Sequence, residues 1–216
     1  MEPKVRYEKE IQSSRHNRTL HIMEAAERVF IVKGIEKATM QDVAREANLG
    51  VATVFRFFPR KDKLIVAVAT SILQKILQAF QSFAAMPIPC LEKIELLFDR
   101  SISLLQNQNS SAVKLMENFE NYAAHYTEPL EDMEAFNSVY REISKVFSSI
   151  IEQGVQDGSI RPGLPIQETL VTFINTFSIF ARKLSLQKNI LLLEQDLPAE
   201  NQLAILKMTL IEYLRN

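Results

Sequence analysis

The sequence predicts an all-α fold. Only 5 glycines occur in 216 residues, and no alternation of apolar and polar residues typical of a strand persists for more than a few positions. Apolar residues instead recur at the three- and four-residue spacing that places them on one face of a helix. With 47% hydrophobic and 24% charged residues, the composition is that of a globular protein.

The chain begins with residues 1–14, which are rich in charged residues and have little to bury, so we expect a flexible N-terminal arm. These residues lack the apolar segment of a secretory signal, and no uninterrupted apolar run reaches membrane-spanning length. We therefore expect a cytoplasmic protein with no membrane partner. A first helix is expected over residues 15–33, with Gly34 as its stop. Its inward stripe consists of Ile22, Ala25, Ala26, Val29 and Phe30.

Residues 39–61 predict two short helices joined by a tight turn. Thr39 suits the cap of a helix over residues 40–47, and Asp42 suits the acidic partner of a capping box. The inward face of this helix consists of Met40, Val43, Ala44 and Ala47. Such a pair of helices is typical of a helix-turn-helix.

Asn48 stands where the chain must reverse, and Asn tolerates the left-handed backbone that such a turn requires. A second helix over residues 51–57 then buries Val54, with Phe58 behind it. This leaves Thr53, Phe55 and Arg56 facing outward. In a helix-turn-helix protein, the outward face lies in the major groove of DNA.

The segment ANLGVATVFRFFPRKDKLI resembles the TetR family of transcriptional regulators, whose corresponding segment is close to AGVSKGTLYRYFPSKEELL. Asn48 and Gly50 replace a turn glycine and a serine cap of the family pattern. Phe55 and Phe57 replace residues that are commonly tyrosine, and phenylalanine cannot donate to phosphate. The resemblance implies DNA contacts from Thr39, Gln41, Gly50, Val51, Ala52, Thr53, Phe55, Arg56, Phe57 and Lys61.

Charge is distributed unevenly along the chain. Residues 1–63 contain 13 Lys and Arg against 9 Asp and Glu, whereas residues 64–216 contain 12 against 17. The basic part is the part that carries the helix-turn-helix, which supports nucleic acid as its partner.

Helices are also predicted beyond the helix-turn-helix. Their ranges are residues 61–86, 90–106, 110–125, 130–157, 165–186 and 199–215. The helix over residues 165–186 is apolar nearly all round, so it must be covered on two sides. The resemblance assigns homodimerisation to residues 165–186 and 199–215, and periodicity does not settle which face of 165–186 meets the partner.

Catalytic and metal-binding patterns are missing from the sequence. No HExxH motif, glycine-rich phosphate loop or GxSxG elbow occurs, and the chain has only 3 histidines and 1 cysteine. We therefore expect a protein that is not an enzyme and that carries no metal or cofactor.

Aromatic residues in the C-terminal half have two interpretations, since such stripes are more often core than binding site. The resemblance favours an effector pocket there, with candidates Phe119, Tyr122, Tyr126, Tyr140, Phe173, Asn175 and Phe177. Lys and Arg are absent from residues 116–136, so a lipophilic neutral or cationic effector fits better than an anion.

Together these features predict a three-helix DNA-binding domain over residues 15–63 and a larger effector-binding and dimerisation domain over residues 64–216. The expected function is that of a dimeric repressor that binds a palindromic operator and is released by a small molecule. A TetR-type activator or a regulator controlled by a protein stays an alternative. From a different class, so does a helical enzyme or interaction module with an incidental helix pair.

Overall fold

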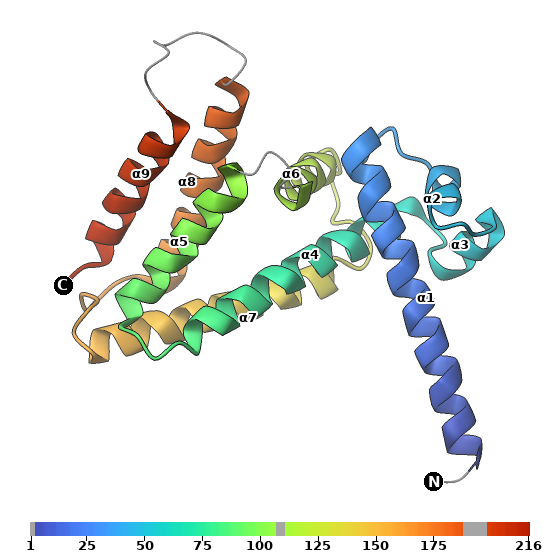
Figure 1. Ribbon diagram of the computed structural model, residues 1–216, viewed down its shortest axis with the longest axis horizontal. Helices are drawn as coiled ribbons and strands as arrows, with labels where there is room; N and C mark the ends of the chain where they lie inside the picture. The colour runs from blue at the N-terminus through green and yellow to red at the C-terminus, as the bar shows by residue number, and fades with distance from the viewer. Residues whose placement is uncertain (1–2, 107–110, 188–197) are drawn as a thin grey trace. The chain divides into compact units, whose positions relative to one another are not determined.

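The computed structural model describes residues 3–106, 111–187 and 198–216, and it confirms the all-α class over this part of the chain (Figure 1). The predicted helix start at residue 110 and the first two residues of the expected arm lie outside the described residues. The helices are α1 (Pro3–Lys33), α2 (Met40–Glu46), α3 (Val51–Phe57), α4 (Lys61–Ala84), α5 (Cys90–Gln106), α6 (Ser111–Ala124), α7 (Met133–Gln156), α8 (Ile166–Gln187) and α9 (Ala199–Leu214).

The predicted start of the first helix, residue 15, is wrong, because α1 already begins at Pro3. Proline suits the first turn of a helix, where its missing N–H has no intrahelical partner to lose. The sequence that follows places opposite charges four positions apart, at Lys4 and Glu8 and at Arg6 and Glu10, a spacing that favours a helix without any apolar stripe. A search for amphipathic periodicity does not detect such a segment.

The chain folds into two compact units, each described here by itself. Unit 1 comprises Met1–Gln74 and Ser111–Val139, and unit 2 comprises Lys75–Ser110 and Tyr140–Asn216. The helices α4 and α7 therefore contribute residues to both units. Unit 1 groups α6 with α1, α2 and α3, and the division into domains at residue 63 stays a prediction.

Unit 1 has its core where the apolar stripes predict it. The inward stripe of α1 is buried, as are Met40, Val43, Ala44 and Ala47 from α2 and Val54 from α3. Figure 1 shows α2 and α3 together on one side of α1. The first half of α4 completes this core with a nearly continuous buried run from Leu64 to Leu73. By length and apolar composition alone α4 would suffice to cross a membrane, but this buried run accounts for its composition.

Unit 2 is built from α5, α8 and α9, which lie side by side (Figure 1), together with part of α7. The ring of Phe98 on α5 packs against Phe173 and Phe177 on α8, with centroids 5.9 and 5.4 Å away. Leu203, Leu210 and Leu214 of α9 are buried in the same core. These contacts make α8 a core helix on one of its sides.

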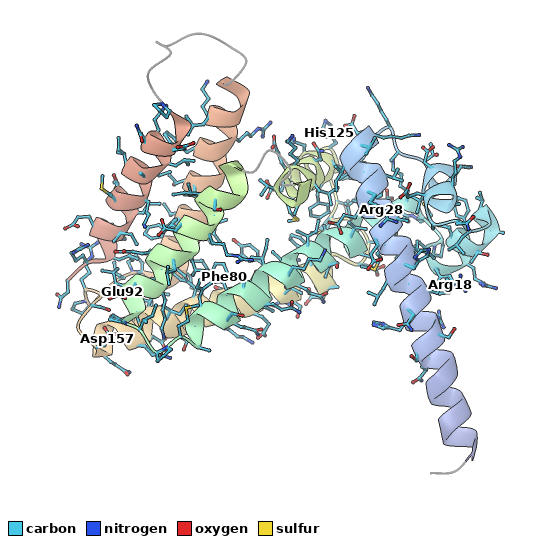
Figure 2. The ribbon with its side chains drawn as sticks, in the orientation of Figure 1. Arg18, Arg28, Phe80, Glu92, His125 and Asp157 are labelled. Carbon is cyan, nitrogen blue, oxygen red and sulfur yellow. The ribbon has the colours of Figure 1, made fainter. Side chains whose placement is uncertain are left out.

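Asp157, labelled in Figure 2, ties the end of α7 to the start of α5. Its carboxylate accepts the backbone N–H of Cys90 at 3.2 Å and that of Ser159 at 2.9 Å. The hydrogen bonds from Ser159 are the largest influence that lowers the pKa of Asp157 to about 2. Burial raises the pKa of the Cys90 thiol, so this cysteine serves as a small apolar residue of the core.

Candidate nucleic-acid interface

The helix α2 begins at a complete capping box, as the sequence predicts. The backbone N–H of Asp42 donates to Oγ1 of Thr39, and the backbone N–H of Thr39 donates to Oδ2 of Asp42, both at 3.1 Å. The Lys33 ammonium, which donates to Asp42 at 2.6 Å, and the bonds from Thr39 lower the pKa of Asp42 to about 2. The end of α1 is thus joined to the start of α2 by an ionised carboxylate.

The turn between α2 and α3 has the predicted left-handed residue, since Asn48 has a φ of 52°. The backbone N–H of Leu49 donates to the carbonyl of Ala44 at 2.9 Å, which closes the turn. Gly50 then occupies the N-cap of α3 without a side-chain hydrogen bond. Because glycine has no side chain, the N-cap residue offers no side-chain acceptor to the first N–H groups of α3.

The helix α1 holds the end of α2 through two side chains. Nε2 of His21 lies 2.9 Å from the carbonyl oxygen of Ala47, and Nε of Arg28 donates to Glu46 at 2.6 Å. Figure 2 labels Arg28 on the part of α1 that packs with α2 and α3. The packing of Ala25, Ala26 and Val29 behind these polar contacts fixes the orientation of the helix-turn-helix within unit 1.

The helix α3 buries Val54 completely and presents its other residues to solvent or to the rim of the core. Phe55 is 40% exposed, a large apolar surface for a helix of this length. The guanidinium carbon of Arg56 lies 5.7 Å from the centre of the Phe57 ring, which itself packs partly on the core. The face of α3 left outside therefore combines an apolar ring with a cation, and both suit a DNA groove.

The predicted DNA-contacting residues differ in exposure. The exposed ones are Thr39, Gln41, Gly50, Ala52, Phe55 and Arg56. The partly buried ones are Val51, Thr53, Phe57 and Lys61. Among the latter, Nζ of Lys61 donates to the carbonyl oxygen of Glu36 at 2.9 Å, and burial lowers the pKa of Lys61. Lys61 thereby supports the loop between α1 and α2.

A charged cluster at the start of α4 is missing from the sequence-based site. Arg60 donates to Asp62 at 2.8 Å and to Glu131 at 3.2 Å, and Nζ of Lys63 lies 2.6 Å from Glu131. Glu131 belongs to unit 1 but lies 71 residues from Arg60 in the chain. No local pattern signals such a pairing, and only the run of acidic residues around Glu131 hints at it.

Of the predicted effector residues, three lie in unit 1. Phe119 is buried and packs on Phe136, with ring centroids 5.1 Å apart. The hydroxyl of Tyr122 donates to Oδ1 of Asp62 at 2.7 Å and lies 2.7 Å from the hydroxyl of Tyr126. Burial, followed by these two bonds, raises the pKa of Tyr122. The polar tip of Tyr122 is thus engaged with α4.

The other predicted effector residues lie in unit 2. Phe173 and Phe177 are buried against Phe98, Tyr140 is partly buried, and Asn175 is exposed. Two surface hollows occur elsewhere among the described residues. One is lined by Ser13, Ser14, Asn17, Arg18 and His21, and the other by Ile151, Glu152, Val155, Gln156, Gly163, Leu164 and Ile166. The described residues contain no cluster of three or more metal-ligating side chains.

Comparison with known proteins places this geometry in a family. Residues 22–68 match the family described as bacterial regulatory proteins, tetR family. The chain is 27% identical over 141 residues to the uncharacterized HTH-type transcriptional regulator YhgD of Bacillus subtilis (strain 168), covering 65% of this chain and 71% of that protein. It is 23% identical over 148 residues to the HTH-type transcriptional repressor KstR2 of Mycolicibacterium smegmatis, covering 67% and 68%.

The fold also matches a solved structure over nearly its full length. The transcriptional regulator FadR from Bacillus subtilis, in complex with stearoyl-CoA, superimposes with a TM-score of 0.70 at 15% identity, covering 91% of this chain and 99% of that one. The matched residues 22–68 span the last part of α1, the capping box, the left-handed turn, α3 and the start of α4. The chain is a member of the TetR family, a helix-turn-helix transcriptional regulator that binds DNA and is not an enzyme.

Proposed function

We propose that this regulator is a repressor that binds a palindromic operator as a homodimer and leaves it when a small lipophilic molecule binds. The observation that carries the proposal is the contrast between the polar, basic helix-turn-helix of unit 1 and an apolar surface on unit 2. One surface suits DNA, and the other suits a second protein chain. A repressor that acts on the chromosome in this way works in the cytoplasm.

The dimer surface in this proposal is the outer side of α8 and α9. Ile179 on α8 is 68% exposed, and Ile205 and Met208 on α9 are 59% and 62% exposed. The two helices pack on each other within unit 2, so these side chains belong to neighbouring elements. Apolar side chains that are gathered in this way mark an interaction site. A twofold axis through this surface would make each copy cover the other.

The same surface distinguishes the sides of α8. Phe173, Phe177 and Leu184 are buried within unit 2, whereas Val171 and Ile179 are exposed. We therefore propose that Ile179 and its neighbours meet the partner and that the phenylalanines face the interior. A dimer places two copies of α3 on one DNA duplex, and successive half-sites then lie about one helical turn apart.

For the effector, we propose contacts from Tyr140, Phe173, Asn175 and Phe177 of unit 2. The buried rings of Phe98, Phe173 and Phe177 form an aromatic cluster that suits a lipophilic molecule. Nearby on α8, the Oγ1 atom of Thr169 is buried without a hydrogen-bond partner. A buried hydroxyl of this kind gains stability when a ligand supplies its partner.

One relative supports repression and one solved structure supports a lipophilic effector. KstR2 of Mycolicibacterium smegmatis is a transcriptional repressor, and the FadR structure contains stearoyl-CoA, a molecule with a long acyl chain. For this chain we propose a neutral or cationic lipophilic molecule, because none of the four proposed contact residues, Tyr140, Phe173, Asn175 and Phe177, carries a positive charge that could pair with an anion. The effector would act on DNA binding through α4, which contributes residues to both units.

The test of repression is a mobility-shift assay with the DNA upstream of the chain's own gene. We expect a discrete complex that a substitution in α3, Arg56→Ala, weakens. The matched control is Arg100→Ala, which removes the same charge from the surface of unit 2. Equal binding by both variants would contradict the placement of α3 in the groove. Increased transcription in the presence of the protein would identify an activator instead.

The test of the effector is a panel of a neutral steroid, a lipophilic cation and a long-chain acyl-CoA. Each compound is scored by thermal shift and by release of the operator complex. We expect release by a neutral or cationic compound, and a weaker response in Thr169→Val, which keeps the side-chain shape and removes the hydroxyl. Release by the acyl-CoA alone would contradict the proposed charge of the effector but agree with the proposal that the effector is lipophilic.

A further inference from the structure

The start of α4 carries cations directly after the DNA-contacting helix, and each of them has a partner inside unit 1. Lys61 donates to the Glu36 carbonyl. Arg60 contacts Asp62 and Glu131, and Lys63 contacts Glu131 at 2.6 Å and Asp132 at 3.4 Å. A DNA phosphate that approaches this end of α4 therefore meets Arg60 and Lys63 already paired with carboxylates and Lys61 already bonded to a carbonyl.

The acidic partners are held in place by the fold. Leu130 is buried in the core of unit 1, and Asp132 adopts a φ of 69°, the left-handed conformation of a tight turn. The backbone N–H of Met133 closes this turn on the carbonyl of Leu130 at 3.3 Å. Glu131 and Asp132 thus start from a fixed position beside α4, so ordering them costs little when they pair with Arg60 and Lys63.

These ion pairs remain accessible to solvent. The side chains of Arg60 and Glu131 are 58% and 47% exposed. Exposed pairs contribute little to stability and exchange readily, so a phosphate can displace the carboxylates. A displaced carboxylate stays nearby and repels the phosphate. The net effect is a lower affinity for DNA than the same cations would give alone.

We propose that Glu131 and Asp132 form an internal acidic clamp that occupies Arg60 and Lys63 and that DNA must displace on binding. This inference rests on the DNA-binding function of the helix-turn-helix. The clamp lowers affinity for every DNA sequence alike, since it acts on phosphate contacts and not on base contacts. It therefore sets a threshold that only the additional base contacts of a specific site overcome.

The clamp also has a connection to α6. Tyr122 donates to Oδ1 of Asp62, and Arg60 donates to Oδ2 of the same carboxylate. A displacement of α6 within unit 1 would therefore alter the position of Asp62 and the pairing of Arg60. Through this route the clamp makes phosphate contacts at α4 sensitive to the position of α6.

The experiment measures the binding of the full-length protein to a mixed-sequence duplex by fluorescence anisotropy, over a range of about 50 to 200 mM salt. We expect Glu131→Gln to bind about threefold to tenfold more tightly, the gain that the loss of two exposed ion pairs allows. The plot of log K against log salt should steepen by about one to two units, because Arg60 and Lys63 then release counterions on binding.

Glu128→Gln is the matched control, because it removes the same charge from an exposed position of the same segment. The double variant Arg60→Gln, Lys63→Gln provides the second arm, in which Glu131→Gln should give no gain. Thermal melting of each variant shows whether it is folded. In this arm the DNA affinity of the double variant is compared with and without Glu131→Gln, so both proteins lack the same two cations.

An equal gain in Glu128→Gln, or an undiminished gain in the double variant, would overturn the clamp and indicate a general effect of net charge. An unchanged affinity and salt slope in Glu131→Gln would also overturn it. These results differ from a failure of the function itself, in which the unsubstituted protein would bind neither the mixed-sequence duplex nor the upstream DNA.

Discussion

Unit 1 and unit 2 are both helical, but their surfaces differ in which side chains are paired and which are exposed. Unit 1 satisfies its polar groups internally, through the capping box, the His21 contact and the ion pairs around Arg60. Unit 2 leaves large apolar side chains such as Ile179 and Met208 outside on two helices that pack on each other. A surface of the first kind suits an exchangeable, charged partner, and a surface of the second kind suits a permanent apolar one. The difference indicates that one fold can supply two binding modes by varying what its helices leave exposed.

The largest expected effect is a loss of folding stability that is confined to unit 2. Phe177 is buried and packs on Phe98, so Phe177→Asp places an unpaired carboxylate in the core and should cost about 5 kcal/mol. Hydrogen exchange followed by mass spectrometry should show loss of protection in α5, α8 and α9. Full protection of these helices in the variant would contradict the assignment of Phe177 to the core.

The next effect separates the two sides of α8. Ile179→Asp should leave the helical content unchanged and weaken the dimer by about a hundredfold, since an unpaired charge at an apolar interface costs several kcal/mol. Sedimentation should then show a monomer at micromolar concentration. Val32→Asp, at an exposed apolar position of unit 1, is the control and should stay dimeric. Dissociation of both variants would contradict the proposal that α8 forms the dimer interface.

A smaller effect tests how unit 1 maintains its helix-turn-helix. Thr39→Ala removes the hydroxyl that caps α2 and should cost about 1 kcal/mol. Thr39→Ser keeps the hydroxyl and should restore most of this loss. Both variants are compared by chemical denaturation, with protection in α2 as the local measurement. A loss of similar size in Thr39→Ser would show that the methyl group, and not the cap, carries the effect.

A pH titration distinguishes the units through one carboxylate in each. The pKa values of Asp42 and Asp157 are both lowered from 3.8 to about 2. A lowered pKa contributes stability above the unfolded pKa near 3.8, and that contribution is lost as the pH falls toward 2. Asp42→Asn should flatten this acid dependence in unit 1, and Asp157→Asn should flatten it in unit 2, as followed by hydrogen exchange. The same response in both units from either variant would contradict their independence.

The smallest effects lie at the DNA contacts of unit 1. Lys61→Ala should lower the slope of log K against log salt by about one unit for every DNA sequence. Because Lys61 also donates to Glu36, the variant should lose about 1 kcal/mol of stability. Thr53→Ala should change the preference among operator variants and leave the salt slope unchanged. Unchanged operator binding in both variants would mean that α3 and the start of α4 do not face the DNA.

Local features of this protein follow from the sequence by itself. The capping box of Thr39 and Asp42, the left-handed Asn48 and the buried Val54 all depend on residues within one helical turn of each other. The helical class follows for the same reason, because it is carried by short-range spacing, and the resemblance to the TetR family rests on one short motif within residues 39–61. The start of α1 is also local, but its sequence shows a spacing of opposite charges and no apolar stripe, so apolar periodicity misses it.

Contacts between distant residues were decided only by the tertiary structure. Spacing along α6 indicates the helix face on which Tyr122 lies, but it does not indicate that Asp62 accepts the hydrogen bond of its hydroxyl. In the same way, no pattern near Lys61 indicates the Glu36 carbonyl, and none near Arg60 indicates Glu131. Periodicity defines which face of a helix is apolar, whereas the packing of that face against other helices decides which polar groups are brought within hydrogen-bonding distance.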